Sequence, residues 1–256
     1  MLCKSLASHN VSVNRKRVSK MQRRDLVLLS FSVLLLVSSA AVVAVLSFMG
    51  AYMHQSLDYF FHEERFGTFY PVALLALSSL SCFSLHVRDA PSFLSVFRNP
   101  VERQNFWFWC GFAFAYLSLD DLFEIHEKID FKLHHWLDAM TGIKSNAVTD
   151  KLDDLIVALV LACAIWFLFK NRVSIASYPA MLASYVFACC LVLLMVIIDF
   201  FTNGGFLLKA LVGKSMYSDL KSFLVVIEES LKIFACSFIL LGSAVPWLHV
   251  PTAKRC

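Results

Sequence analysis

The chain has 256 residues, of which 59% are hydrophobic and 16% charged, and its formal net charge is +4. Soluble domains have about a quarter charged residues, so this composition excludes an ordinary soluble protein. The 8 glycines and 6 prolines are also too few for a collagen-like or low-complexity chain. The hydrophobic residues come in long runs, which predict a single integral membrane unit.

Six of these runs are candidates for membrane-spanning helices. Five contain no Asp, Glu, Lys or Arg, and they cover residues 26–57, 66–87, 104–119, 155–169 and 173–198. The sixth covers residues 222–245 and is interrupted by Glu228, Glu229 and Lys232. A spanning helix needs about 20 residues, so the third and fourth runs place their flanking acids at the membrane edge. We therefore predict an all-α integral membrane bundle of about six transmembrane helices.

The first run follows the basic stretch "NRKRVSKMQRR", as the core of a signal peptide would. Its apolar part is much longer than the roughly 7–15 residues of a signal core, so we expect a retained first helix. The basic stretch could instead contact nucleic acid or anionic lipid. A topology anchor explains it more simply, and we expect no nucleic-acid partner.

Basic residues are unevenly divided between the two sides of such a bundle. The side with both termini carries fourteen Lys and Arg residues, against eight in the longer loops of the other side. The positive-inside rule then places both termini in the cytoplasm, and we expect the plasma membrane as the location. Residues 1–25 form a basic cytoplasmic tail, residues 26–250 the transmembrane domain, and residues 251–256 a short cytoplasmic tail. The bilayer is the expected partner, and a homo-oligomer or a second membrane protein is left open.

Tryptophans and cysteines give weaker signals. We expect Trp107, Trp109 and Trp247 at the cytoplasmic interface, where aromatic residues favour the headgroup zone. Six of the eight cysteines lie in predicted helices without any C-x-x-C spacing, and they are interpreted as small packing residues. After Glu127, an amphipathic extension of the third helix is predicted, because apolar residues recur there at helical spacing.

The stretch "FAYLSLDDLFEIHEKID" places five carboxylates and a histidine at the end of the third run. Counting 1.5 Å per residue puts its acids at the outer end of the third helix. The same count places acids of the fifth and sixth helices at a similar depth. The candidate polar site is therefore Asp120, Asp121, Glu124, His126, Glu127, Asp199, Glu228, Glu229 and Lys232.

The direction in which each charged side chain points on its helix can be estimated from the helical period. On the third helix, Asp120, Glu124 and Glu127 fall within about 60°, Asp121 lies about 60° further round, and His126 points away. On the sixth helix, Lys232 lies between Glu228 and Glu229 and can pair with either. A charge at the bilayer centre costs about 2.5–3.5 kcal/mol, so such residues usually face the bundle interior. Separate interfacial acids or internal salt bridges are the alternative to a shared site.

The segments "LSLDDLFEIHEKI" and "VVIEESLKIFACSFILLGSAV" resemble a group of bacterial six-helix membrane proteins without an assigned activity, and this resemblance implies a bacterial inner membrane as the location. Members of that group carry an L-D-E-x-x-x-x-H-E motif late in one helix and an E-E-x-x-E/K motif early in the last helix. This chain departs from the group at Asp121, where glutamate is expected, and at Lys232, where an acid is often found. The resemblance implies that the two acidic segments act as one set, and it implies no reaction.

Three functions from different classes fit these observations. A proton- or cation-coupled transporter would use the carboxylates as carriers. A membrane enzyme would bind a divalent metal through the carboxylates and His126, although no tight ligand spacing occurs and no cofactor or metal is assigned. A non-catalytic assembly subunit would hold the same acids in ion pairs such as Glu228–Lys232. Whether the protein is an enzyme stays open.

Overall fold

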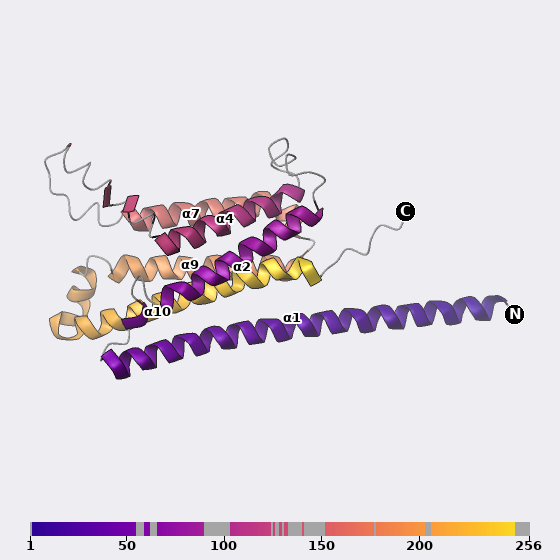
Figure 1. The fold of residues 1–256 in the computed structure, drawn as a ribbon, viewed down its shortest axis with the longest axis horizontal. Coiled ribbons are helices and arrows are strands. Elements are labelled where there is room, and N and C mark those ends of the chain that lie inside the picture. Colours follow the sequence, from indigo (N-terminus) through magenta and orange to yellow (C-terminus); the bar gives the residue numbers. More distant parts are fainter. Residues whose placement is uncertain are drawn as a thin grey trace.

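The computed structural model describes residues 2–54, 59–61, 66–89, 103–123, 125, 128–129, 131–132, 140, 152–176, 178–202 and 206–248. All regular structure in these residues is helical, which confirms the predicted all-α class (Figure 1). The six long helices are α1 (Leu2–His54), α2 (Phe66–Asp89), α4 (Arg103–Phe123), α7 (Leu152–Lys170), α9 (Pro179–Thr202) and α10 (Phe206–Leu248). Two short elements, η1 (Tyr59–Phe61) and α8 (Arg172–Ile175), lie between them.

The helices end where the hydrophobic runs end if a helix-breaking residue is present at that point. Elsewhere the helices are longer than the runs. The fifth run divides into α8 and α9, and α9 begins at Pro179, because proline suits the first turn of a helix. α10 begins at Phe206, well before the predicted start of the sixth run, and it continues through Pro246. α1 includes the basic tail in one continuous helix. Hydrophobicity locates the apolar part of such helices and not their ends.

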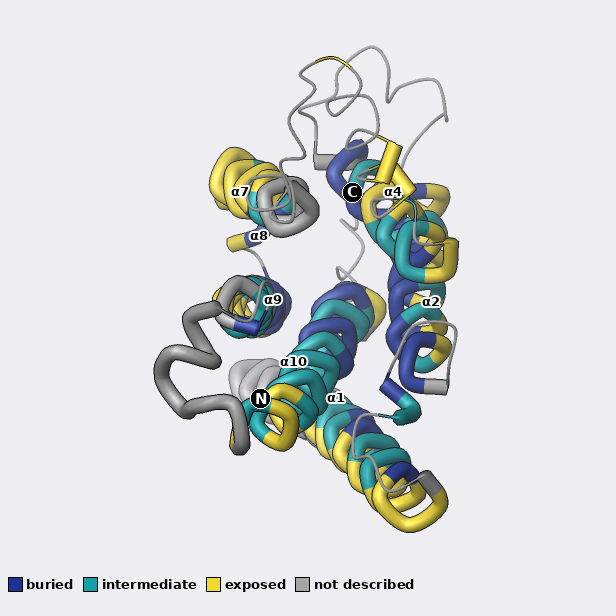
Figure 2. The backbone as a smooth tube through the Cα atoms, turned by 90° about the vertical axis from the view of Figure 1, so that its left-hand side faces the viewer, coloured by how far each residue is buried: buried dark blue, intermediate teal, exposed yellow. Residues whose placement is uncertain are grey.

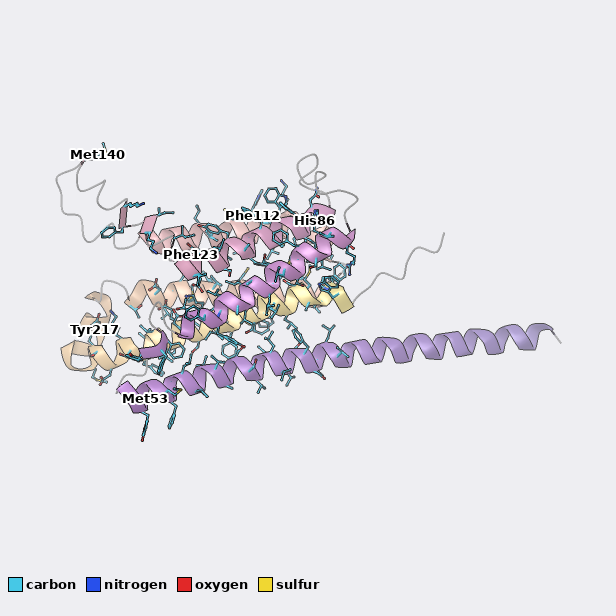
Figure 3. All side chains as sticks on the ribbon, in the orientation of Figure 1. Met53, His86, Phe112, Phe123, Met140 and Tyr217 are labelled. Carbon is cyan, nitrogen blue, oxygen red and sulfur yellow. The ribbon has the colours of Figure 1, made fainter. Side chains whose placement is uncertain are left out.

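Three helices of the described residues are long and apolar enough to cross a membrane: Val27–Met53, Gly67–Asp89 and Pro179–Asp199. Ala158–Lys170 is apolar but shorter. Most residues of these apolar stretches are not buried, because the buried share is 6% for Val27–Met53, 39% for Gly67–Asp89 and 22% for Pro179–Asp199. Yellow, exposed segments recur around the helices in Figure 2, and Met53, Phe112 and Phe123 are among the exposed side chains (Figure 3). Large exposed apolar surfaces of this kind suit a protein that is surrounded by lipid.

Serine hydroxyls join the helices where they cross. Ser79 on α2 donates to the carbonyl of Gly111 on α4 at 2.8 Å, and the Ser39 and Ser237 hydroxyls of α1 and α10 lie 2.7 Å apart. Ser81 donates to the carbonyl of Ser243 at 3.0 Å, linking α2 to α10. Small residues let helix backbones approach closely, and their hydroxyls then hydrogen-bond across the contact. This packing is typical of membrane helices.

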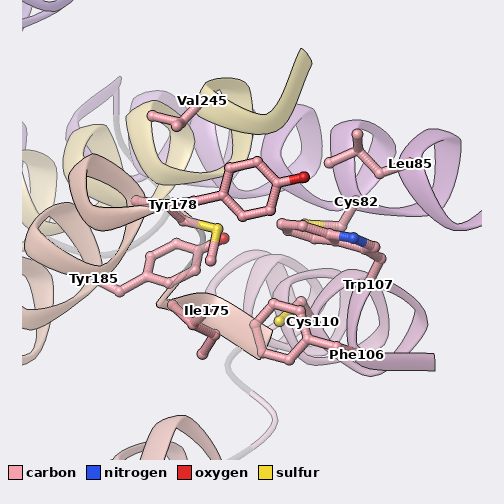
Figure 4. Packing of buried hydrophobic residues seen from close by; sticks show 10 residues of the cluster. Cys82, Leu85, Phe106, Trp107, Cys110, Ile175, Tyr178, Tyr185 and Val245 are labelled. Carbon is pink, nitrogen blue, oxygen red and sulfur yellow. The ribbon is translucent and has the colours of Figure 1, made fainter. Parts of the chain in front are cut away.

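A cluster of buried residues fills the end of the bundle opposite the acidic segments. Figure 4 shows Trp107, Tyr178 and Tyr185 in this cluster, with Cys82 and Cys110 between the helices. Trp107 is only 4% exposed, so its ring packs inside the bundle, while its depth in the membrane stays a prediction. Trp247 is 40% exposed, and its Nε1 donates to Ser81 at 2.9 Å. The predicted packing role holds for Cys82, Cys110 and Cys236, which are buried, whereas Cys163 and Cys190 are exposed.

Candidate functional site

The candidate site lies between the end of α4 and the middle of α10. α4 is held on α2 by two side-chain hydrogen bonds, from Ser79 to the Gly111 carbonyl and from Ser118 to the Val72 carbonyl at 3.1 Å. Ser118 lies almost one turn before Asp121, so this contact fixes the position of Asp121 along α2. α10 packs against α9, α2 and α1. The two helices that carry the charges are therefore both anchored on α2.

Lys232 is the centre of the site. Its Nζ lies 2.9 Å from Oδ1 of Asp121 on α4 and 3.5 Å from Oε1 of Glu229 on its own helix. The side chains of Asp121 and Glu229 are 14% and 16% exposed, and that of Lys232 is 27% exposed. We call these three residues the charge cluster. It joins the two acidic segments of the sequence through one ammonium group.

Apolar packing closes the cluster on the side towards the bundle centre. Cys236, one turn after Lys232, is buried. Around it lie Leu35, Leu74 and Leu75, with Phe114 and Leu117 of α4 packed against them. The medium around the charges is therefore poorly polarisable, and interactions between the charges are stronger there than in water.

The remaining predicted site residues divide into two groups. Asp120 and Glu228 are partly buried next to members of the charge cluster, and Asp199 is partly buried near the end of α9. Glu124, His126 and Glu127 lie outside the described residues. α4 ends at Phe123, whose carbonyl accepts a hydrogen bond from Lys128 at 2.6 Å. A lysine at this place satisfies a terminal carbonyl and suits the negative end of the helix.

Two features of this region were not predicted. The helical wheel gave Lys232 only partners on its own helix, whereas its shorter contact is to Asp121 on α4. A hydroxyl cluster also links α1, α2 and α10, because the Tyr70 hydroxyl lies 3.2 Å from that of Ser38 and 3.3 Å from that of Ser39. Ser39 in turn contacts Ser237. The small residues of "VSSAAV" and "FACSF" are the signal that could have indicated this crossing.

The charge cluster has two carboxylates for one ammonium group, so its formal charge is −1 when all three residues are ionised. Oδ2 of Asp121 is buried and receives no hydrogen bond from the described part of the chain. Such a site can accept a proton or a small cation, since either would neutralise it. Across the residues that the structure describes, no three His, Cys, Asp or Glu residues are grouped as a metal site would require.

Neither the curated proteins nor the solved structures contain a match to this chain. One family model does match, over residues 28–245, and that range includes both acidic segments and most of the six long helices. The match extends over far more than half of the sequence. The chain therefore belongs to the family described as "Domain of unknown function (DUF8692)".

Proposed function

We propose that this protein spans the plasma membrane six times, with both termini in the cytoplasm, and works as a small proton- or cation-coupled transporter. The charge cluster of Asp121, Glu229 and Lys232 is its ion site. The observation that carries the proposal is that two carboxylates share one ammonium group inside an apolar helical bundle. Ionisable groups among membrane helices commonly belong to ion pathways or proton relays.

The six-span arrangement has support beyond the three most apolar helices. The beginning of α1 and the end of α10 lie towards the same end of the bundle in Figure 1, which suits an even number of crossings. In the same view, α4 and α7 run lengthwise along the bundle with α2 and α9. The charges of α4 and α10 turn towards each other, and this avoids the cost of exposing them to lipid.

The charge balance of the cluster supports an ion-binding role. The cluster has one carboxylate more than it has ammonium groups, and every carboxylate that is taken out of water carries a desolvation cost. A proton or a monovalent cation would remove that excess charge. Binding and release of the ion would then change the charge of the contact between α4 and α10, which is the kind of local change that a transport cycle requires.

A second candidate is a non-catalytic assembly protein in which the cluster only holds helices together. The contact between Asp121 and Lys232 favours it, because this ion pair joins two helices that are both anchored on α2. In that case, changes in the cluster would alter stability and nothing else.

Ion flux into vesicles that contain the purified full-length protein tests the transport proposal. A potassium diffusion potential drives uptake, and dyes inside the vesicles report pH and sodium. We expect flux above that of empty vesicles, and loss of this flux in Glu229→Gln. Asp89→Asn is the matched control, because Asp89 pairs with Arg88 at the opposite end of α2. Wild-type protein without flux of any of these ions would overturn the proposal, as would equal loss in the Asp89 control.

A further inference from the structure

At the centre of the charge cluster, we infer that Lys232 determines which ion the site accepts. Its ammonium group occupies the place between Asp121 and Glu229 that a sodium or potassium ion would take. The protein therefore discriminates against alkali cations, and the ion of the proposed transport is the proton. This inference rests on the proposed function, since it names the ion that the same site serves.

The ammonium group contacts one carboxylate oxygen on each of two helices. Nζ of Lys232 lies 2.9 Å from Oδ1 of Asp121 on α4 and 3.5 Å from Oε1 of Glu229 on α10. The lysine ammonium is a compact point charge of one unit, as an alkali cation is. A sodium or potassium ion at the position of Nζ would therefore meet the same two oxygens. Lys232 fills this position with a cation that is covalently attached to α10.

The surroundings of the cluster make this occupancy exclusive. Cys236 is buried one turn after Lys232, and Leu74 and Leu75 of α2 belong to the same apolar cluster as Cys236. Repulsion between two cations a few Å apart is stronger in such surroundings than in water. A sodium or potassium ion that approached the two carboxylates would therefore be repelled by Lys232, which cannot diffuse away.

A proton differs from an alkali cation in where it binds. It adds directly to an oxygen of a carboxylate, which then becomes an O–H donor. It does not need the position between the two carboxylates, and Lys232 can keep that position when a proton arrives. An alkali cation would have to displace the ammonium group from the same position. Lys232 thus excludes one class of ion and leaves the site open to the other.

Removal of Lys232 should therefore create an alkali-cation site that the wild type lacks. Lys232→Met leaves the carboxylates of Asp121 and Glu229 on two helices and vacates the position between them. Sodium or potassium would then restore the positive charge that the substitution removes. A ligand that binds only the folded protein also stabilises it, so this binding is measurable as a change in stability.

Thermal unfolding of the purified full-length protein in detergent tests the inference. Sodium chloride replaces choline chloride in steps at constant total chloride concentration, so that the ionic strength does not change, and potassium chloride is tested in the same way. The unfolding midpoint of Lys232→Met should rise by about 2–4 °C where the salt exceeds its dissociation constant several-fold. The midpoint of the wild type should be the same in all three salts.

Three further variants serve as controls. Lys232→Arg keeps a cation at this position and should behave as the wild type does. Lys221→Met removes an exposed lysine of the same helix and should show no response to sodium or potassium. The double variant Asp121→Asn with Lys232→Met should lose the response, because one of the two carboxylates is gone. A wild type stabilised as much as Lys232→Met, or a Lys232→Met protein without any response, would overturn the inference.

The vesicle experiment gives a second readout that needs no substitution at Lys232. We expect the internal pH to change during flux through the wild type and the internal sodium concentration to stay constant. Sodium uptake by the wild type would overturn this inference and leave the transport proposal in place. If vesicles show no flux of any ion but sodium stabilises Lys232→Met alone, the transport proposal fails while the exclusion of alkali cations by Lys232 holds. Lys232→Gln, which keeps a polar side chain, replaces Lys232→Met if that variant does not fold.

Discussion

The ammonium group of Lys232 lies 2.9 Å from a carboxylate oxygen of Asp121, and this contact links α10 to α4 across the bundle. The same ammonium group also contacts Glu229 at 3.5 Å. Lys232 thus contacts two carboxylates, and its contact with Asp121 is shorter than its contact with Glu229. This asymmetry leads to an ordered set of stability effects.

Lys232→Met should destabilise the protein more than Asp121→Asn. Loss of Lys232 removes the ammonium group that both partly buried carboxylates contact, whereas loss of the Asp121 charge leaves Lys232 paired with Glu229. Removing one partner of a fully buried pair costs about 3–5 kcal/mol. Because these side chains keep some exposure, we expect about 1–3 kcal/mol for Lys232→Met.

Chemical unfolding in detergent measures this difference. Lys221→Met is the control, because Lys221 is an exposed lysine of the same helix and its loss should change little. The double variant Asp121→Asn with Lys232→Met should be less destabilised than the sum of the two single variants, since the residues are in contact. Additive effects would contradict a direct interaction between Lys232 and Asp121.

The serine contact between α1 and α10 should be sensitive to size more than to polarity. Ser39 and Ser237 are fully buried, and their hydroxyls lie 2.7 Å apart. Hydrogen bonds between membrane helices contribute about 0.6 kcal/mol on average, so Ser237→Ala should have a small effect. Ser237→Leu should separate the helices, because its larger side chain has no space between them.

The yield of a covalent cross-link between α1 and α10, measured in detergent for each of these variants, reports on that separation. Ser84→Leu is the control, because Ser84 is exposed on α2. Equal yields of cross-linked protein in Ser237→Leu and the wild type would show that α1 is held in place by other contacts.

From the sequence, a depth can be expected for each charged residue, but its partner cannot. Depth follows from the rise per residue and from where an apolar run begins, and Pro179 gives such a start for α9. Partners depend on how each helix is rotated against its neighbours. The wheel grouped Asp120 with Glu124 and Glu127, whereas the acid in contact with Lys232 is Asp121. That rotation is set by small residues such as Ser79 and Gly111, whose packing role a one-dimensional reading does not reveal.

Helix length was also underestimated for a physical reason. The first part of α10 carries Lys209, Lys214, Asp219 and Lys221, so hydrophobicity does not mark it as part of a span. A helix needs backbone hydrogen bonds and suitable side chains, and neither requires an apolar surface. α10 accordingly begins at Phe206 and reaches the charge cluster only near its middle.

Gly242→Ala should destabilise the contact between α10 and α9 more than Gly111→Ala destabilises that between α4 and α2. A Cβ at Gly242 would lie 2.6 and 2.8 Å from two ring atoms of Tyr185, whereas a Cβ at Gly111 would lie 3.0–3.1 Å from the ring of Phe83. Tyr185 is buried, and its hydroxyl lies 3.1 Å from that of Ser243, so its ring has little freedom to move.

We expect about 1–3 kcal/mol for Gly242→Ala, which is typical of overpacking, and a smaller loss for Gly111→Ala. Thermal unfolding in the same detergent measures both. Ala183→Gly is the control. Ala183 is exposed on α9, so this change removes a methyl group from a helix surface. A Gly242→Ala protein as stable as the wild type would show that Tyr185 can move aside.

Reporter fusions at residues 144 and 250 distinguish a six-span topology from one in which only the three most apolar helices cross. With six spans and a cytoplasmic N-terminus, position 144 follows three crossings and lies outside, whereas position 250 follows six and lies inside. If only Val27–Met53, Gly67–Asp89 and Pro179–Asp199 crossed, position 144 would lie inside and position 250 outside. The two arrangements thus predict opposite results at both positions.

We expect the six-span result, because fourteen basic residues lie on the side with the termini against eight on the other. A fluorescent protein fused after residue 250 should therefore be bright, and alkaline phosphatase fused there should be inactive. Phosphatase inserted at residue 144 should be active. Activity of phosphatase at 250 together with its absence at 144 would reject the six-span topology. It would also place α4 outside the bilayer, and the charge cluster would then no longer be an intramembrane ion site.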